Sequence, residues 1–260
     1  MAYSESFIDL RGIKIQLLKG GSGAPLLYLH GAGGEVAWLP FFEHLSRRFT
    51  VYVPAHPGFA RSEGMERIDD IHDLVFHYVE LMEALGLEAP HVVGLSLGGW
   101  LAAELAVHQT RRLSRLVLID AVGLRVEEAA PIPDIFTVMP PGLRRLLFFE
   151  PESETARAMI PDQASGEQLE FALRAREATA RLAWNPYLYD RRLRERLHRV
   201  AVPTLIIWGD SDRLVPREHA EAYRRGIQGS RLVTIEKCGH APPFEKPDET
   251  ARLVTDFLGK

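Results

Sequence analysis

The 260-residue chain has a single cysteine, no long apolar run and no excess of basic residues. Cys238 alone cannot form an intrachain disulfide, so nothing indicates an oxidising compartment. No stretch approaches the roughly 18 uninterrupted apolar residues of a membrane span. The net charge of −4 argues against nucleic acid as a partner. Residues 1–16 lack the pattern of a signal peptide. We therefore expect a cytoplasmic protein that acts on a small molecule; nothing predicts its oligomeric state.

Signatures of metal and nucleotide binding are also missing. The glycines at 31, 33 and 34 do not have the G-x-G-x-x-G spacing, and no G-K-[ST] follows a glycine-rich loop. The sequence shows no metal-ligand cluster, because seven of its histidines are scattered singly, at positions 44, 72, 77, 91, 108, 198 and 219. We therefore expect no metal and no organic cofactor.

Short apolar runs alternate with helical patterns through most of the chain. Residues 6–20 resemble a hairpin. The strand-like runs are 24–31, 49–58, 90–94, 113–123, 202–210 and 230–236, and the helical patterns are 35–49, 69–86, 97–109, 217–226 and 248–259. Strands that alternate with helices predict an α/β fold, with a mostly parallel central sheet that has helices on both faces.

Residues 124–199 interrupt this alternation. They contain six prolines between positions 131 and 161 and then a helical pattern at 166–184, with no strand-like run. The alternation resumes afterwards, so we predict a helical cap (124–199) inserted in a core made of residues 1–123 and 200–260. The basic run at 191–199 is interleaved with leucines and is typical of an amphipathic helix of this cap.

One serine lies between glycines where an apolar strand meets a helix. Gly94-Leu95-Ser96-Leu97-Gly98 has the G-x-S-x-G pattern in the strand–turn–helix context of a nucleophile elbow. A serine needs a base, and the base needs an orienting group. His240 follows the last expected strand and Asp212 follows the one before it. Because the carboxyl ends of parallel strands share one edge of the sheet, Ser96, Asp212 and His240 can converge there.

With these motifs, the chain resembles the α/β-hydrolases over nearly its whole length. The matching segments are "HGAGG" at 30–34, "HPGFARS" at 56–62, "GLSLGG" at 94–99, "GDSD" at 209–212 and "GHAP" at 239–242. The resemblance implies a nucleophile at Ser96, a general base and acid at His240, and its carboxylate partner at Asp212. It further implies an oxyanion hole made by the backbone N–H groups of Leu97 and Ala32, with Gly33 as the alternative to Ala32.

Other polar residues near these motifs have alternative interpretations. Asp120 ends a strand at a position from which some relatives supply the acid, but we favour Asp212. We expect Asp210 to be a turn residue, His30 to fix the oxyanion loop and Cys238 to be a small buried side chain. His56 and Arg61 are expected to shape a turn.

The leading functional hypothesis is a serine hydrolase that cleaves a small, largely apolar carboxylic ester or lactone through an acyl-enzyme. The same triad also serves carbon–carbon bond hydrolases of the meta-cleavage-product type and cofactor-free perhydrolases. "GHAPPFEKP" lacks the tryptophan that commonly follows the histidine in the first of these groups, although several arginines of the cap, including 144, 145, 174, 176 and 181, could bind a substrate carboxylate. A hypothesis of another class is a small-molecule receptor on a hydrolase scaffold.

Overall fold

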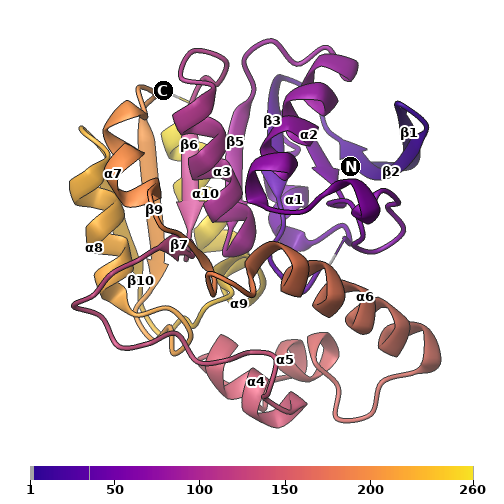
Figure 1. The fold of residues 1–260 in the computed structure, drawn as a ribbon, viewed down its shortest axis with the longest axis vertical. Coiled ribbons are helices and arrows are strands. Elements are labelled where there is room, and N and C mark those ends of the chain that lie inside the picture. The colour runs from indigo at the N-terminus through magenta and orange to yellow at the C-terminus, as the bar shows by residue number, and fades with distance from the viewer. Residues whose placement is uncertain (1–2, 35, 260) are drawn as a thin grey trace.

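A computed structural model describes residues 3–34 and 36–259. Its central sheet has eight strands in the order β1-β2-β4-β3-β5-β6-β9-β10 (Figure 1). The strands are β1 (Tyr3–Leu10), β2 (Ile13–Gly20), β3 (Ala24–Leu29), β4 (Phe49–Pro54), β5 (His91–Leu95), β6 (Leu116–Ile119), β9 (Thr204–Gly209) and β10 (Arg231–Ile235). β1 and β2 form an antiparallel hairpin that joins β4 in the antiparallel sense, and all other pairs are parallel. The predicted α/β class is thereby confirmed.

Helices cover both faces of this sheet. One face packs against α1 (Pro40–Leu45) and α10 (Pro247–Leu258), which contact each other. The other face packs against α2 (Ile71–Ala84), α3 (Leu97–His108) and α8 (Arg217–Gly226). Short helices η1 (Met65–Arg67) and α9 (Pro242–Glu245) lie in the connections. The strands are buried on both faces, which explains their nearly continuous apolar sequences.

Most of the predicted elements are present, but the first helix is shorter than expected. The helical pattern at 35–49 contains a helix of only six residues, which begins at Pro40. Proline favours the first turn of a helix because it lacks an N–H group and has a fixed φ angle. The preceding residues therefore form a connection after the sheet, and Glu35 lies outside the described residues.

The segment 124–199 contains α4 (Pro140–Leu147), α5 (Glu154–Met159) and α6 (Gly166–Ala183), and Figure 1 shows these three helices gathered at one end of the molecule. It also contains a strand that the sequence did not reveal, β8 (Tyr189–Asp190), which pairs in parallel with β7 (Gly123–Leu124). These strands have two residues each, too short to produce a sequence pattern.

The basic run at 191–199 forms α7 (Leu193–Arg196) and η2 (Leu197–Arg199), which contact α8 and α3. Leu193 and Leu197 are fully buried there. This run therefore packs against helices of the sheet layer, by which we mean the sheet with its covering helices, α7 and η2 included. We call residues 124–190 the inserted segment.

Candidate active site

The register of the parallel strands brings the predicted site residues to one edge. Leu95 pairs with Ile119, Ile119 with Ile207, and Gly209 with Ile235. The residues that come after these strand ends therefore lie close together, as predicted for the carboxyl edge of a parallel sheet.

Ser96 has a strained backbone, with φ 53° and ψ −113°, between β5 and α3. The glycines around it are needed because the chain passes very close to its neighbours. A Cβ atom at Gly94 would lie 2.2 Å from the Gly98 carbonyl oxygen, and one at Gly98 would lie 2.1 Å from the Leu29 carbonyl oxygen. Neither site has room for a side chain, so the glycines permit the tight turn that presents the serine.

Ser96, His240 and Asp212 form one hydrogen-bonded chain. His240 Nε2 lies 2.8 Å from Ser96 Oγ, and His240 Nδ1 lies 2.7 Å from Asp212 Oδ2. The other Asp212 oxygen, Oδ1, accepts the backbone N–H groups of Leu214 and Val215 at 2.8 and 2.9 Å. These bonds fix the carboxylate, the carboxylate orients the imidazole, and the imidazole is placed to take the serine proton.

The loop at residues 31–34 lies against Ser96. A Cβ atom at Gly31 would be 3.5 Å from Ser96 Cβ, and the loop turns through a Gly34 N–H bond to the Gly31 carbonyl. Leu97 is the first residue of α3, where helix geometry leaves the backbone N–H without a partner inside the helix. The segments that contain Leu97 and Ala32 therefore both lie next to the serine.

Two buried histidines hold the loop at residues 31–34 in place. His30 accepts the backbone N–H of His56 on Nε2 at 2.9 Å and donates from Nδ1 to the Gly31 carbonyl at 2.8 Å. His56 Nε2 donates to the His30 carbonyl at 3.0 Å, and its Nδ1 lies 2.5 Å from the Tyr78 hydroxyl. Burial lowers the pKa of His30 to about 4, so the pair is neutral at pH 7 and holds both loops through hydrogen bonds.

Asp120 lies beside the triad without bonding to the histidine. Its Oδ1 accepts the Gly209 N–H at 3.0 Å, and its Oδ2 is buried with no hydrogen-bond donor among residues 3–34 and 36–259. One ligand atom from each of Asp120, Asp212 and His240 lies within 4.8 Å of the others. Burial, and then the neighbouring Asp212 charge, raise the pKa of Asp120 well above its usual range. Burial therefore favours the neutral form of the Asp120 carboxyl, whereas Asp212 makes the bond to His240.

The remaining candidates lie around this centre. Asp210 accepts hydrogen bonds from Ser211 Oγ and the Cys238 N–H, as a turn residue does. Cys238 is buried, and burial raises the pKa of its thiol far above the usual range. The Arg61 side chain is exposed and lies 3.4 Å from the Glu5 carboxylate near the β1–β2 hairpin.

Glu245 is a site residue that the sequence did not reveal. Its two carboxylate oxygens accept the N–H groups of Gly239 and Phe149, each at 2.7 Å. It therefore ties the histidine loop to the inserted segment, together with the His240 N–H, which donates to the Leu147 carbonyl at 2.7 Å. No signal in the sequence links residues 149 and 245, because only the folded chain brings them together.

The inserted segment also contacts the oxyanion-side loops. Thr179 Oγ1 donates to the Ala32 carbonyl at 3.2 Å, and a Cβ atom at Gly34 would lie 3.4 Å from the Ala175 methyl group. The Arg174 and Arg181 guanidinium groups donate to the carbonyls of Ser62 and Met65 at 3.0 and 2.6 Å. The inserted segment therefore contacts the loop at residues 31–34 and the connection after β4, besides the loop of His240.

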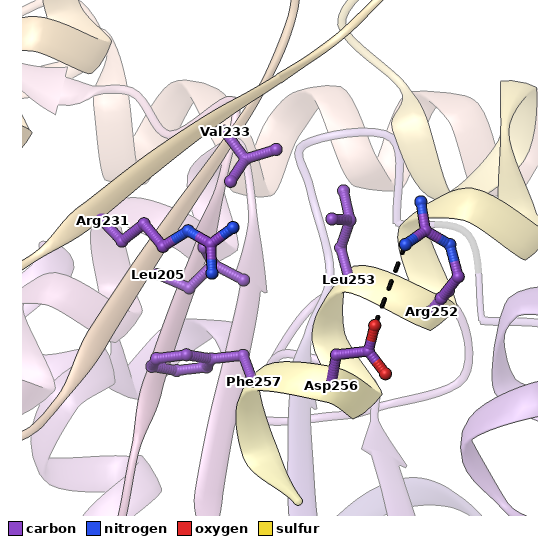
Figure 2. A pocket seen from close by; sticks show the side chains of 7 residues that line it. All are labelled: Leu205, Arg231, Val233, Arg252, Leu253, Asp256 and Phe257. Carbon is purple, nitrogen blue, oxygen red and sulfur yellow. Dashed lines mark ion pairs between the residues drawn. The ribbon is translucent and has the colours of Figure 1, made fainter. Parts of the chain in front are cut away.

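A hollow of about 330 Å³ lies elsewhere, between β9, β10 and α10 (Figure 2). Its lining mixes apolar residues such as Phe257 with the Arg252–Asp256 ion pair, whose charged atoms are 3.8 Å apart. Leu205 and Arg231 are at the amino ends of their strands, and the triad comes after the carboxyl ends. This hollow is thus separate from the candidate active site.

Comparisons with known proteins agree with this architecture. The model of the alpha/beta hydrolase family matches residues 26–253. This chain belongs to the alpha/beta hydrolase family. It is 30% identical to a 2-hydroxy-6-oxo-6-phenylhexa-2,4-dienoate hydrolase of Comamonas testosteroni, over 96% of this chain and 93% of the relative. It is 28% identical to a monoacylglycerol lipase of Xenopus laevis, over 92% of this chain and 77% of the relative.

Solved structures of this family have the same fold. The crystal structure of a bacterial membrane phospholipase A superposes with a TM-score of 0.83 at 27% identity, covering 99% of this chain and 86% of that one. A meta-cleavage product hydrolase superposes with a TM-score of 0.78 at 26% identity, covering 98% and 97%. Among the described residues of our alpha/beta hydrolase, none of the helices is long and apolar enough to cross a membrane.

The family match and the hydrolase relatives identify the chain as an enzyme of the hydrolase class, whose relatives act on several kinds of bond.

Proposed function

We propose that this hydrolase cleaves a small, largely apolar carboxylic ester or lactone through an acyl-enzyme on Ser96. The observation that carries the proposal is the unbroken chain of hydrogen bonds from Ser96 Oγ through His240 to Asp212, with distances of 2.8 and 2.7 Å. Because these three side chains are almost completely buried, their contacts are protected from competition by water.

The proposed reaction has two halves. Ser96 Oγ attacks the carbonyl carbon while His240 Nε2 takes the serine proton, and the Asp212 carboxylate stabilises the imidazolium. The N–H groups of Leu97 and Ala32 bind the oxyanion, and the loss of one such donor costs about 3–4 kcal/mol. The tetrahedral intermediate expels the alcohol, which receives its proton from His240. Water then attacks the acyl-enzyme by the same proton relay and releases the carboxylic acid and free Ser96.

The inserted segment has the role of a cap in this proposal. We assign it the positioning of the loops around Ser96, through Thr179 on the oxyanion side and Leu147 on the histidine side. Substrate selection then depends on side chains of this segment, as it commonly does where loops cover a rigid scaffold.

The arginines of the inserted segment favour a neutral substrate. Arg144, Arg174, Arg176 and Arg181 each hydrogen-bond to backbone carbonyls of the protein. Arg145, the fifth arginine considered, is exposed. None of these five therefore offers a buried, unpaired cation to a substrate carboxylate, whereas an ester or lactone requires none.

Carbon–carbon bond hydrolysis is the second candidate. The relatives named as dienoate hydrolases favour it, since they match 92% or more of this chain at 27–30% identity. Their named substrates are carboxylates, and Ala241 follows the histidine of this chain in place of the tryptophan common in the meta-cleavage-product group. These two features make the ester or lactone the first choice.

The test has two stages. A fluorophosphonate probe should label the wild-type protein at Ser96 and fail to label Ser96→Ala; a wild-type protein that is not labelled would contradict the proposal and favour a receptor. Turnover is then compared for short-chain nitrophenyl esters, lactones and ring-fission dienoates. Esters or lactones should be the faster substrates, and hydrolysis of the dienoates alone would establish the second candidate.

A further inference from the structure

A second cluster of titratable side chains lies at the other end of α3 from Ser96. His72 is at the start of α2, Glu104 and His108 are on α3, and Asp190 is in β8. His72 Nε2 lies 3.5 Å from Asp190 Oδ2, and His108 Nε2 lies 3.8 Å from Glu104 Oε2. One ligand atom from each of His72, Glu104 and His108 lies within 4.8 Å of the others. The fold has thus gathered two imidazoles and two carboxylates from three separate elements.

Glu104 is the unusual member of this cluster. It is fully buried, and its Oε1 accepts the indole N–H of Trp100 at 3.2 Å. Its Oε2 is inaccessible to solvent, lies 3.8 Å from His108 Nε2 and accepts no hydrogen bond from the described residues. A buried carboxylate oxygen without a partner is unfavourable, and a bound cation would remove that cost.

In the part of the chain that the structure describes, two arginines lie near the cluster. Arg196 Nη1 lies 3.9 Å from Asp190 Oδ1, and Arg199 donates to the Val107 carbonyl close by. Asp190 Oδ1 also accepts the Arg192 N–H at 2.7 Å, which leaves Oδ2 to face His72. The arginines reduce the net negative charge but occupy neither imidazole.

We propose that His72, Glu104, His108 and Asp190 form a binding site for a divalent first-row transition metal ion, with zinc as the best match. Zinc binds imidazole nitrogen and carboxylate oxygen at about 2.0–2.2 Å in a tetrahedron, which places neighbouring ligand atoms about 3.3 Å apart. Two of the separations, 3.5 and 3.8 Å, are already close to that value. The side chains of His72 and His108 are 34% and 41% exposed, which leaves both imidazoles room to rotate toward a shared metal ion.

The chemistry of the donors excludes the hard cations. Magnesium and calcium prefer six or more oxygen ligands, whereas two of the four ligands here are nitrogen. Glu104 and His108 are four residues apart on one helix face, the spacing that helical zinc ligands use. A metal at this position joins α2, α3 and β8, where the chain returns from the inserted segment. The site is therefore structural, and it is independent of the function proposed for Ser96.

Calorimetry with zinc chloride on the full chain tests this site. We expect one zinc ion per chain and a melting temperature that rises by several degrees at saturating zinc. The double variant His72→Ala/His108→Ala removes two half-exposed ligands and should weaken zinc binding by about 100-fold or more, because even the loss of a supporting contact weakens metal sites about 10–100-fold. Glu104→Gln, which keeps the Trp100 bond, should weaken it at least about tenfold.

Two controls make the result specific. His44 forms a similar half-exposed pair with Asp248, at 2.9 Å, so His44→Ala should leave zinc affinity unchanged. His240→Ala removes a ligand from the group formed by Asp120, Asp212 and His240, and it should also leave affinity unchanged. Zinc binding that persists in the double variant, that is lost in His240→Ala, or that magnesium matches in affinity would overturn the proposal.

Discussion

The sheet layer and the inserted segment are held in place by different kinds of contact. In the sheet layer, neighbouring backbone segments pass so close to each other that only glycine fits at some positions. A Cβ atom at Gly209 would lie 2.0 Å from the Gly239 carbonyl oxygen. Apart from the backbone contact between Leu147 and His240, the inserted segment is attached largely through side-chain ends, such as those of Arg174 and Arg181, that donate to carbonyls. It also carries four of the large exposed apolar residues: Met139, Leu169, Leu173 and Trp184.

Because of this difference, we expect the two regions to have different roles at the candidate active site. The sheet layer supplies the groups proposed to react, in fixed positions that packing determines. The inserted segment supplies contacts to the loops that carry them. We therefore expect substitutions in the sheet layer to affect the chemical step most, and substitutions in the inserted segment to affect stability and positioning.

The largest effect is expected for Asp212, the proposed carboxylate partner of His240. Asp212→Asn should lower kcat about 10³–10⁴-fold, because an amide neither stabilises the imidazolium nor selects the correct tautomer. Asp120→Asn should change kcat only severalfold, since an amide resembles the neutral acid and can still accept the Gly209 N–H. Ester turnover and melting temperature measure both. A larger loss of kcat in Asp120→Asn than in Asp212→Asn would show that Asp120 is the carboxylate that acts with His240.

The second effect tests the attachment of the inserted segment. Arg144 is buried and pairs with Asp162 at 2.8 Å and with Glu152 at 3.6 Å. Arg144→Ala should destabilise the segment by about 1–3 kcal/mol, because the Ile160 carbonyl loses its hydrogen bond and the two acids, which are 49% and 56% exposed, lose their buried partner. Arg157 contacts the same two acids but is exposed, so Arg157→Ala should cost less than about 1 kcal/mol. Limited proteolysis between residues 124 and 190 and thermal unfolding would compare them; equal losses would show that the burial of Arg144 makes no difference.

The third effect is a pH dependence confined to the sheet layer. Burial lowers the pKa of His77 from 6.5 to about 4, so the unfolded chain takes up a proton between those values while the folded one does not. The free energy of unfolding should therefore decrease as the pH falls from 6.5 to 4, by up to about 1.4 kcal/mol per pH unit for this residue.

Urea unfolding of wild type and His77→Gln at pH 7.5, 5.5 and 4.5 isolates that contribution. The variant should lose less stability on acidification and match the pH dependence of the wild type above pH 6.5. Residues 125–188 contain no histidine, so histidine protonation should leave proteolysis of that stretch unaffected. Parallel acid profiles for the two proteins would show that His77 already titrates normally in the folded state.

The smallest effect is expected at the contact between the two regions. Thr179→Val removes the hydroxyl that donates to the Ala32 carbonyl while it keeps the side-chain shape. We expect a loss of about 1 kcal/mol in stability and a fall of a few-fold in kcat/KM as the oxyanion loop loosens. Thr50 donates to the Gly23 carbonyl at 3.0 Å, far from the site, so Thr50→Val is the matched control. Activity equally reduced in both variants would remove Thr179 from the positioning role.

The sequence was sufficient for the parts of this enzyme that local pattern determines. Buried strands, glycine-bounded turns and the serine motif predicted the alpha/beta hydrolase fold, which the family match confirms. It also predicted the three side chains that the structure brings together, whose catalytic roles stay predictions. The sequence did not predict contacts between residues that are far apart along the chain. The neutral Asp120 next to Asp212, the Glu245 bridge to residue 149 and the grouping of His72 with His108 depend on helix packing and loop approach, which produce no periodicity.

The burial of Cys238 makes the protein suitable for site-specific labelling. The only thiol of the chain is enclosed, and burial keeps it protonated, so thiol reagents should leave the native protein unlabelled. A cysteine introduced at exposed Leu173 could then carry a fluorophore or spin label against a clean background. A second label on the sheet layer would report by distance, during turnover, whether the two regions move relative to each other.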